Sequence, residues 1–175
     1  CTFENNTAVN DGGAMNNNSS SPTITDCQFI ANEAGSDGGA IRNQSSDPEI
    51  TNCVFDSNQS LSGGGGYNNS SSPSLTDCTF TSNTTDEGGG MYNSSSNPTL
   101  TNCTFENNTA TVFGGGMFNY TDSNPTLENC TFTNNTATTY DGGGMYNYES
   151  SPTLTGCIFT GNAADLGGGM YNDSS

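Results

Sequence analysis

Large apolar residues recur at fixed intervals along this chain, always inside the same short pattern of apolar and polar positions. The string Cys-x-Phe-x-x-Asn occurs seven times, and the repeating unit is 25 to 27 residues long. Its copies begin at Cys1, Cys27, Cys53, Cys78, Cys103, Cys130 and Cys157. A period in this range indicates an array of small units that bury their apolar faces only by stacking on their neighbours.

Each unit contains two short segments in which apolar and polar residues alternate, for example around Leu100 and around Thr104. This period of two predicts strands with one buried face, and no window has the 3.6-residue apolar stripe of a helix. Between the two segments lies a residue of a type that tolerates the left-handed backbone conformation, which predicts a sharp corner. The corner residues are Asp26, Asn52, Asp77, Asn102, Asn129 and Gly156.

Coils of this length, with short strands and tight corners, stack into a parallel β-helix. We therefore predict an all-β fold, a right-handed parallel β-helix (solenoid) of about seven coils with 25–27 residues per coil. We see no linker in the sequence. Residues 1–175 are thus predicted to form a single parallel β-helix repeat domain that is uncapped at both ends.

Stacking turns each position of the unit into a ladder of like residues that runs along the axis. The inward ladders are predicted to be Cys27, Cys53, Cys78, Cys103 and Cys130; Phe29, Phe55, Phe80, Phe105 and Phe132; and Asn32, Asn58, Asn83, Asn108 and Asn135. Stacked Phe rings supply most of the buried area, and each Asn amide bonds to the amides above and below it. We interpret these Asn residues as structural ladders and not as ligand contacts.

The composition taken alone would indicate disorder, because hydrophobic residues make up 29% of the chain and its net charge is −17. The regular repeat overrules that interpretation. The charge also argues against binding to nucleic acid or to anionic membrane surfaces, since both require basic residues and the chain has one, Arg42. We expect no nucleic-acid partner and no membrane insertion.

Two short motifs of the repeat carry a family resemblance. Each unit pairs the Phe-x-x-Asn string with a Gly-rich string, which reads Gly-Gly-Ala-Met at 12–15 and Gly-Gly-Ala-Ile at 38–41. This pairing resembles the FxxN and GGA[ILV] repeats of the polymorphic membrane proteins, and the resemblance covers all of the chain. Those proteins look like surface-exposed β-helical adhesins of the autotransporter type, which implies an extracellular or cell-surface location and a binding or scaffolding role.

The cysteines are an odd number for a secreted chain, in which thiols normally pair. In the predicted register they form one inward column. Parallel side chains hold neighbouring Cβ atoms farther apart than the roughly 3.8 Å that a disulfide prefers, so we expect reduced, buried thiols. A zinc site is excluded because the chain has no His and no Cys-x-x-Cys pair.

The residues available for catalysis are few. With no His and no Lys, the chain lacks the usual general base and any cationic cluster for an oxyanion, so we predict no enzyme activity and no cofactor. Four carboxylates precede the Gly-rich turns, and we interpret them as a solvated acidic edge: Asp37, Asp86, Glu87 and Asp141.

The same edge offers weak candidates for Ca²⁺, which prefers carboxylate and carbonyl oxygens. They are Asp11, Asp37, Glu87 and Asp141. Their column is expected to be interrupted at Gly63 and at Phe113, so no specific metal site is predicted.

Two outward columns suggest binding surfaces. Thr residues on both sides of the Leu/Ile position form a Thr-x-Thr array that resembles the ice-binding face of β-solenoid antifreeze proteins, although Glu49 and Glu128 interrupt it. An aromatic column beside the Gly turns is able to stack on sugars or on a neighbouring rod, or it is simply an exposed edge of packed rings. Its members are Tyr67, Tyr92, Phe118, Tyr146 and Tyr171.

Asn-x-Ser/Thr sequons are abundant, but those in the Asn ladders are expected to be inaccessible. The outward candidates for glycosylation are Asn5, Asn107 and Asn134, and the Ser tails such as 94–96 are alternative O-linked sites.

The functional expectation is an extracellular structural repeat protein that forms a rod or filament by end-to-end stacking of coils. Uncapped ends expose unpaired backbone groups, so the expected partner is another copy of the chain in a head-to-tail homopolymer. The alternative is a cell-surface adhesin domain that binds host or carbohydrate ligands. An ice-binding solenoid and a carbohydrate-active β-helix enzyme are lesser alternatives.

Overall fold

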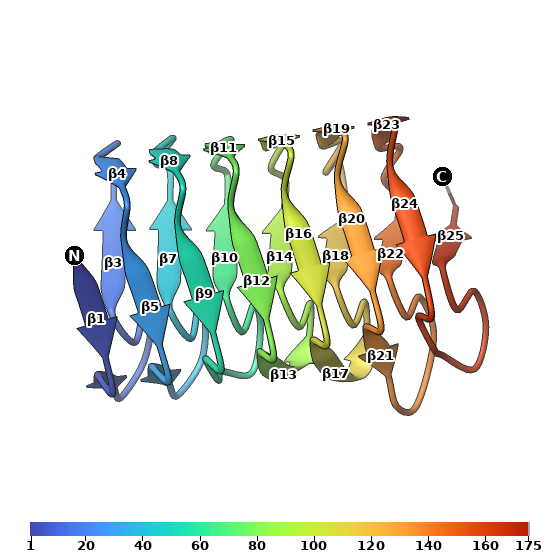
Figure 1. Cartoon of the computed structure of the whole chain (residues 1–175), viewed down its shortest axis with the longest axis horizontal. Coiled ribbons are helices and arrows are strands. Elements are labelled where there is room, and N and C mark those ends of the chain that lie inside the picture. The colour runs from blue at the N-terminus through green and yellow to red at the C-terminus, as the bar shows by residue number, and fades with distance from the viewer. Residues whose placement is uncertain (175) are drawn as a thin grey trace.

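The computed structural model describes residues 1–174, which form a stack of similar coils along one axis (Figure 1). This part of the chain contains 25 short strands and no helix. Every strand pairs in parallel with the strand one repeat before or after it. The predicted all-β fold, a parallel β-helix of about seven coils, is therefore confirmed.

Three long sheets run the length of the stack. The first contains β1 (Thr2–Glu4), β5 (Gln28–Ile30), β9 (Val54–Asp56), β12 (Thr79–Thr81), β16 (Thr104–Glu106), β20 (Thr131–Thr133) and β24 (Ile158–Thr160). The second contains β3 (Met15–Asn18), β7 (Ile41–Gln44), β10 (Gly66–Asn69), β14 (Met91–Ser94), β18 (Met117–Tyr120), β22 (Met145–Tyr148) and β25 (Met170–Asp173). The third contains β4 (Thr23–Thr25), β8 (Glu49–Thr51), β11 (Ser74–Thr76), β15 (Thr99–Thr101), β19 (Thr126–Glu128) and β23 (Thr153–Thr155).

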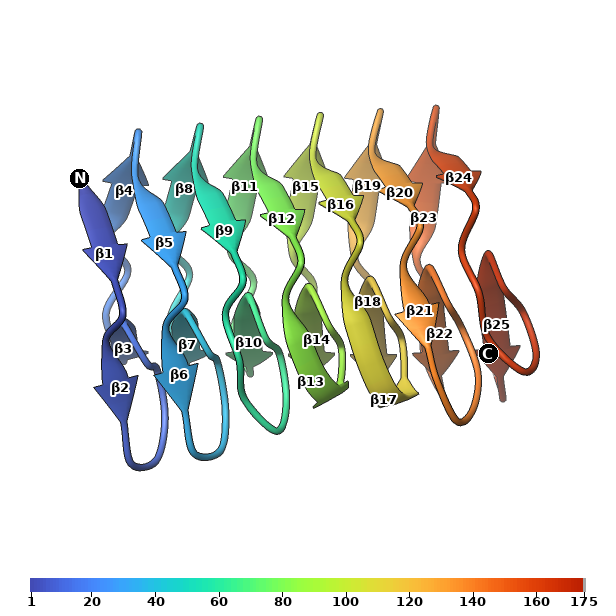
Figure 2. The same ribbon diagram turned by 60° about the horizontal axis from the view of Figure 1, so that its bottom comes forward.

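Shorter strands follow the first sheet before the chain turns into the second, as Figure 2 shows. They form one pair and one group of three: β2 (Thr7–Ala8) with β6 (Glu33–Ala34), and β13 (Thr84–Glu87) with β17 (Thr109–Phe113) and β21 (Thr136–Ala137). The loops after these short strands vary in length and composition between coils. They are the least regular part of the repeat.

Left-handed backbone conformations mark four corners of each coil. The predicted corner is present in all six copies, with φ between 51° and 64° from Asp26 to Gly156. Of three further corners, the Gly-rich turn was predicted and the other two were not. One follows the first sheet at Asn5 and its equivalents, one is the Gly38 column, and one follows the second sheet at Ser45 and its equivalents. Only the Gly column has a residue that adopts positive φ without steric cost in every coil.

The interior is built from files of identical side chains. Neighbouring Phe rings of the first sheet stack with centroids 4.4 to 5.0 Å apart and planes within 4° of parallel. The structure places the inward Leu and Ile residues of the third sheet and the Met residues of the second sheet against them. The inward Cys column lies beside them and is buried from Cys27 to Cys130. Together these files form one continuous apolar core.

The first Asn ladder satisfies the backbone where the chain leaves the first sheet. The Nδ2 group of Asn58 donates to Oδ1 of Asn83 at 3.0 Å and to the carbonyl oxygen of Phe29 at 3.0 Å. Its backbone N–H donates to the same Oδ1 at 2.9 Å. Each buried amide therefore bonds to the coils before and after it, which stabilises their spacing and leaves no buried donor of that side chain unpaired.

Two more polar ladders complete the interior. The second Asn column, inside the second sheet, is linked by Nδ2 to Oδ1 bonds of 2.8 to 2.9 Å. A Ser ladder that the sequence did not reveal follows it, in which the N–H of Ser71 donates to Oγ of Ser96 at 3.0 Å. Because Ser96 is fully buried, the prediction that 94–96 offers O-linked sites is wrong for that residue.

The Gly-rich strings allow successive coils to approach closely. A Cβ added at Gly89 would overlap the carbonyl oxygen of Gly115 in the next coil, and one added at Gly90 would lie 2.6 Å from a ring carbon of Phe105. The second position of each string therefore excludes any side chain. Among the described residues, no helix long and apolar enough to cross a membrane is present.

The Phe file gives a direct test of the core. Phe80 is fully buried between Phe55 and Phe105, so Phe80→Ala removes two stacking contacts and leaves a cavity. We expect it to lower the free energy of unfolding by about 3 to 5 kcal/mol, measured by urea denaturation. The control is Thr81→Ala on the outward side of the same strand, which should change it by about 0.5 kcal/mol or less. Equal effects of the two substitutions would contradict the packing described.

Candidate functional site

Three rows of side chains run side by side along one face of the stack. The first, the acidic row, precedes the Gly turns and comprises Asp11, Asp37, Ser62, Glu87, Phe113 and Asp141. The other two rows point outward from the second sheet. The inner row is Asn16, Arg42, Tyr67, Tyr92, Phe118, Tyr146 and Tyr171, and the outer row is Asn18, Gln44, Asn69, Ser94, Tyr120, Tyr148 and Asp173. These rows carry the largest chemical variation in the repeat.

The first coils of the three rows are polar and charged. Nε of Arg42 lies 3.6 Å from a carboxylate oxygen of Asp11 and 3.9 Å from one of Asp37. Its Nη2 donates to Oε1 of Gln44 at 2.7 Å. Burial and the nearby Asp11 charge raise the pKa of Asp37, and the guanidinium of Arg42 opposes that rise. The one basic side chain of the chain is thus held between two carboxylates.

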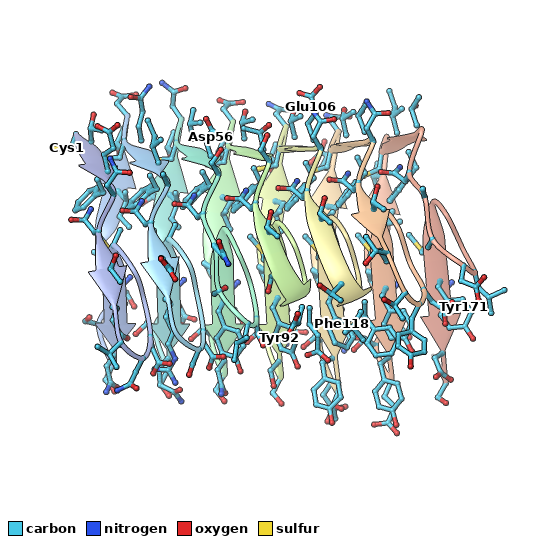
Figure 3. The ribbon with its side chains drawn as sticks, turned by 90° about the horizontal axis from the view of Figure 1, so that it is seen from below. Cys1, Asp56, Tyr92, Glu106, Phe118 and Tyr171 are labelled. Carbon is cyan, nitrogen blue, oxygen red and sulfur yellow. The ribbon has the colours of Figure 1, made fainter. Side chains whose placement is uncertain are left out.

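The later coils of the same rows are aromatic. Along the inner row, Tyr92 and Phe118 meet edge to face, with centroids 5.0 Å apart and planes at 81°. Phe118 and Tyr146 do the same at 5.1 Å and 77°. Tyr120 and Tyr148 of the outer row stack with centroids 5.5 Å apart. The members labelled in Figure 3, Tyr92, Phe118 and Tyr171, follow one another along one edge of the molecule.

The structure departs from the expectation of an exposed edge of rings. The three central members of the inner row are nearly buried: Tyr92 is 8% exposed, Phe118 is 4% exposed and Tyr146 is 5% exposed. Phe113 approaches from the acidic row, with its ring 4.6 Å from that of Tyr146, and Tyr120 packs on Phe118 at 5.9 Å. The sequence marked Phe113 only as an interruption of the acidic column and did not mark Tyr120, because each occurs where other coils carry a different residue type.

The rings surround an open groove of about 630 Å³. We call it the aromatic groove. Its lining consists of six rings and two carboxylates: Glu87, Tyr92, Phe113, Phe118, Tyr120, Tyr146, Tyr148 and Asp173. The groove combines apolar ring surface and polar groups in about equal parts, so it offers both stacking and hydrogen bonding to a ligand.

The acidic groups at the groove influence its phenols. Burial, followed by the charge of Glu87, raises the pKa of Tyr92 well above its usual range. Burial, followed by the charge of Asp173, raises the pKa of Tyr146 to about 12. The hydroxyl of Tyr146 donates to a carboxylate oxygen of Asp173 at 3.4 Å. Burial and the adjacent Asp86 raise the pKa of Glu87.

The four calcium candidates are not brought together. Asp11 and Asp37 pair with Arg42, whereas Glu87 lies two coils beyond Asp37 and lines the aromatic groove. Asp141 accepts a bond from the N–H of Leu166 at 3.0 Å. Within 1–174, no group of three or more His, Cys, Asp or Glu side chains is positioned to hold a metal ion.

One interruption of the acidic row is at a different residue from the one predicted. Ser62 lies opposite Asp37 and Glu87, and Gly63 belongs instead to the left-handed Gly column. The loop of this coil is one residue shorter than that of the coil before it, and the Gly turn fixes the register. The second interruption is at Phe113, as expected.

The other predicted surface features take the following positions. The glycosylation candidates Asn5, Asn107 and Asn134 are exposed, and all three lie at the left-handed corner after the first sheet.

The Thr array lies on the outward face of the third sheet, with Glu49 and Glu128 in its rows. These two charges interrupt an otherwise uncharged surface.

The seven cysteines are free thiols. Sγ of Cys103 lies 3.5 Å from the carbonyl oxygen of Thr101 and 3.8 Å from that of Leu75 in the preceding coil, within range of weak S–H hydrogen bonds. Cys1 is exposed and Cys157 half-buried, while the five between them are buried. The column is part of the core and not part of the groove.

Comparison with known proteins identifies the repeat. A family model described as "Right handed beta helix region" matches residues 1–105 and, in an overlapping match, residues 64–175. The two matches together span the chain. No curated protein and no solved structure matches it.

The state of the thiols can be measured directly. A thiol-alkylating reagent should label Cys1 readily and Cys157 slowly in the native protein, because the other five thiols are buried. In urea without reductant it should label all seven. Mass spectrometry after each treatment counts the labels. Thiols that stay unlabelled in urea until reductant is added would reveal disulfides between coils and contradict this description.

Ionisation of the groove phenols should couple to stability at high pH. Tyr146 has a pKa of about 12 in the folded chain against an ordinary 10.0, so its protonated form favours folding. That contribution is complete below pH 10 and is lost as the pH rises through about 12. Ultraviolet titration of phenolate should show a late phase, to which Tyr92 also contributes, and Tyr146→Phe should remove one phenol from that phase. Loss of one phenol from the ordinary phase near pH 10 instead would show that Tyr146 ionises normally.

Proposed function

We propose that this chain, which belongs to the right-handed β-helix family, is a rigid rod segment of an extracellular or cell-surface protein. The observation that supports this role most directly is the unbroken register of like residues through successive coils, from Phe3 to Phe159 in the first sheet alone. A stack of this kind resists bending because each inner coil is bonded to both of its neighbours along three sheets. Its length scales with the number of coils.

Charge on the sides of the rod supports an extended, separate particle. The carboxylates that give the chain its net charge of −17 lie on the outward faces and in the loops, as Asp56 and Glu106 do along one edge in Figure 3. Like charges on neighbouring rods repel, which disfavours contact side by side. A rod that joins another at its end meets less repulsion, and the hydrogen bonds of the Asn and Ser ladders continue from one rod into the next.

We further propose that coils of different molecules stack on the axis. The strands of a coil at the edge of the described stack, such as β24, have one strand neighbour, and the ring of Phe159 stacks on one other ring, that of Phe132. A further coil would extend the Phe, Leu and Asn ladders with the same geometry, whether it belongs to the same polypeptide or to another copy.

An extracellular or cell-surface location is part of this proposal. The paired Phe-x-x-Asn and Gly-Gly-Ala strings resemble repeats of the polymorphic membrane proteins, and the sequons at Asn5, Asn107 and Asn134 are exposed where glycan addition would not disturb the core. The carboxylates of the acidic row lie on one side of the stack, Asp11 and Asp37 beside Arg42. Because the sequence has no His and no Lys to serve as a general base, we propose a scaffolding or binding role and not a catalytic one.

An adhesin function is the second candidate, and a specific observation favours it. The aromatic groove breaks the repeat on one lateral face, where a ligand would reach it without disturbing the stack. We do not extend the proposal to ice binding, because Glu49 and Glu128 place charges within the Thr rows.

Small-angle X-ray scattering over a wide concentration range tests the rod and its stacking. We expect a particle of constant cross-section that lengthens with concentration in steps on the order of 34 Å, the height of seven coils. Electron microscopy should show unbranched filaments at the highest concentration. A globular particle would contradict the rod, and a rod of constant length would contradict stacking between molecules.

Two substitutions on one strand provide a matched control for stacking. Phe159→Lys places a charge in the ring file at the edge of the described stack and should shorten the filaments. Ile158→Lys adds the same charge at a side chain that is 56% exposed on the outward face, and it should leave their length unchanged. If both variants shorten the filaments equally, added charge and not the ring file controls their growth.

A further inference from the structure

We propose that the aromatic groove binds an arginine side chain presented by a partner protein. This goes beyond the rod role, since it assigns a ligand chemistry to a lateral face that the stacking of coils does not use. The argument rests on Arg42, on the arrangement of the rings, and on the charge at the groove.

Arg42 shows how the three rows accommodate a guanidinium. It occupies the inner row, with carboxylates of the acidic row 3.6 and 3.9 Å from its Nε and an acceptor of the outer row 2.7 Å from its Nη2. The next residue of the inner row, Tyr67, pairs with it in register. The three rows thus provide carboxylate, acceptor and ring positions around one basic side chain.

The aromatic groove is formed by the same three rows farther along the stack, spread over several coils, without a basic residue of its own. Glu87 occupies the acidic row, Tyr92 and Tyr146 the inner row, and Tyr148 the outer row. The sequence contains a single Lys or Arg, and that residue, Arg42, is already paired with Asp11 and Asp37. A cation beside Glu87 must therefore come from another molecule.

The rings of the inner row offer a sugar no flat platform. A sugar stacks on a flat, exposed ring face, whereas Tyr92, Phe118 and Tyr146 are nearly buried, and Phe118 stands at 81° to Tyr92 and at 77° to Tyr146. The rings open to a ligand are those of the outer row, Tyr120, which is 41% exposed, and the half-buried Tyr148. A cation gains from the negative face of an aromatic ring, and Arg adds stacking of its planar guanidinium.

The overall charge of the chain also favours a basic partner. A net charge of −17 attracts cationic segments over a distance set by the salt concentration, and Glu87 supplies a carboxylate at the groove for a charge-assisted hydrogen bond. An arginine side chain satisfies both requirements, because its guanidinium donates hydrogen bonds in one plane and presents its faces to the rings.

The binding experiment uses a short peptide with one arginine and the same peptide with citrulline, a neutral group of nearly identical shape. Both are titrated into the full chain, and binding is followed by the ring proton signals in NMR spectra. We expect the arginine peptide to shift signals of Tyr120 and Tyr148 and the citrulline peptide to bind about fivefold to thirtyfold more weakly. Raising the ionic strength from about 0.05 to about 0.5 M should weaken arginine binding.

Two single substitutions locate the site. Glu87→Gln should weaken binding of the arginine peptide at least about fivefold, whereas Glu106→Gln, the same change on the edge opposite the aromatic residues in Figure 3, should leave it unchanged. Tyr148→Leu removes a ring of the outer row and should also weaken binding. Near-ultraviolet circular dichroism confirms that each variant is folded.

Several results would overturn the proposal. Equal affinity for the arginine and citrulline peptides would show that the guanidinium charge is not recognised. Equal loss in Glu87→Gln and Glu106→Gln would show a diffuse attraction to the acidic surface. Binding of a methyl glycoside with shifts of the same rings, together with no binding of the arginine peptide, would identify the groove as a sugar site. None of these results bears on the length of the rods, which tests the rod role separately.

Discussion

Parallel pairing of each strand with its own copy one repeat later is the constraint on which this structure depends. Coils bonded in this way lie about 4.8 Å apart, and the register places every residue above its equivalent. Each position must therefore be occupied by a residue type that packs well against itself. Phe rings do so by stacking, Asn amides by donating to the next Oδ1, and Gly by allowing carbonyl groups of adjacent coils to come close. Few large apolar residues are needed, because each one is covered by its own neighbours in the file.

The sequence predicted those features that this constraint imposes on every coil. The Phe file, the first Asn ladder and the corner at Asp26 follow from strictly recurring columns, and the parallel fold follows from their period. The Ser ladder escaped because Ser71 and its equivalents lie in a tail where Ser is frequent, so that its recurrence carried no signal. The corner after the first sheet escaped for a related reason. Ala31 and Ser57 occupy it as well as Asn107, so the column had no residue type to mark it.

The groove could not be predicted from the repeat because it is made from exceptions to it. Phe113 stands where other coils have Asp, Ser or Glu, and Tyr120 and Tyr148 stand where earlier coils have Asn, Gln or Ser. The structure is needed to place Phe113 beside them, since the loop before each Gly turn varies in length and shifts the alignment, as it does at Gly63. Tyr92 and Phe118 belong to a recurring column, but their burial depends on those non-recurring neighbours. Residues that vary within a repeat are therefore the informative ones for binding.

The division between interior and rows separates stability from recognition. Interior positions tolerate little change, because a substitution in one file disturbs the coils on both sides, whereas the three rows lie outside that core and differ in residue type from coil to coil. The change from Asp37 and Arg42 in the early coils to Phe113 and Tyr146 in the later ones shows how far they diverge while the ladders beneath them stay constant. A rod built this way can carry different chemistry at each level of one face without any cost to its core. The position of a coil along the axis then determines which side chains its three rows present. The number of coils determines how many such sets of side chains a single rod presents.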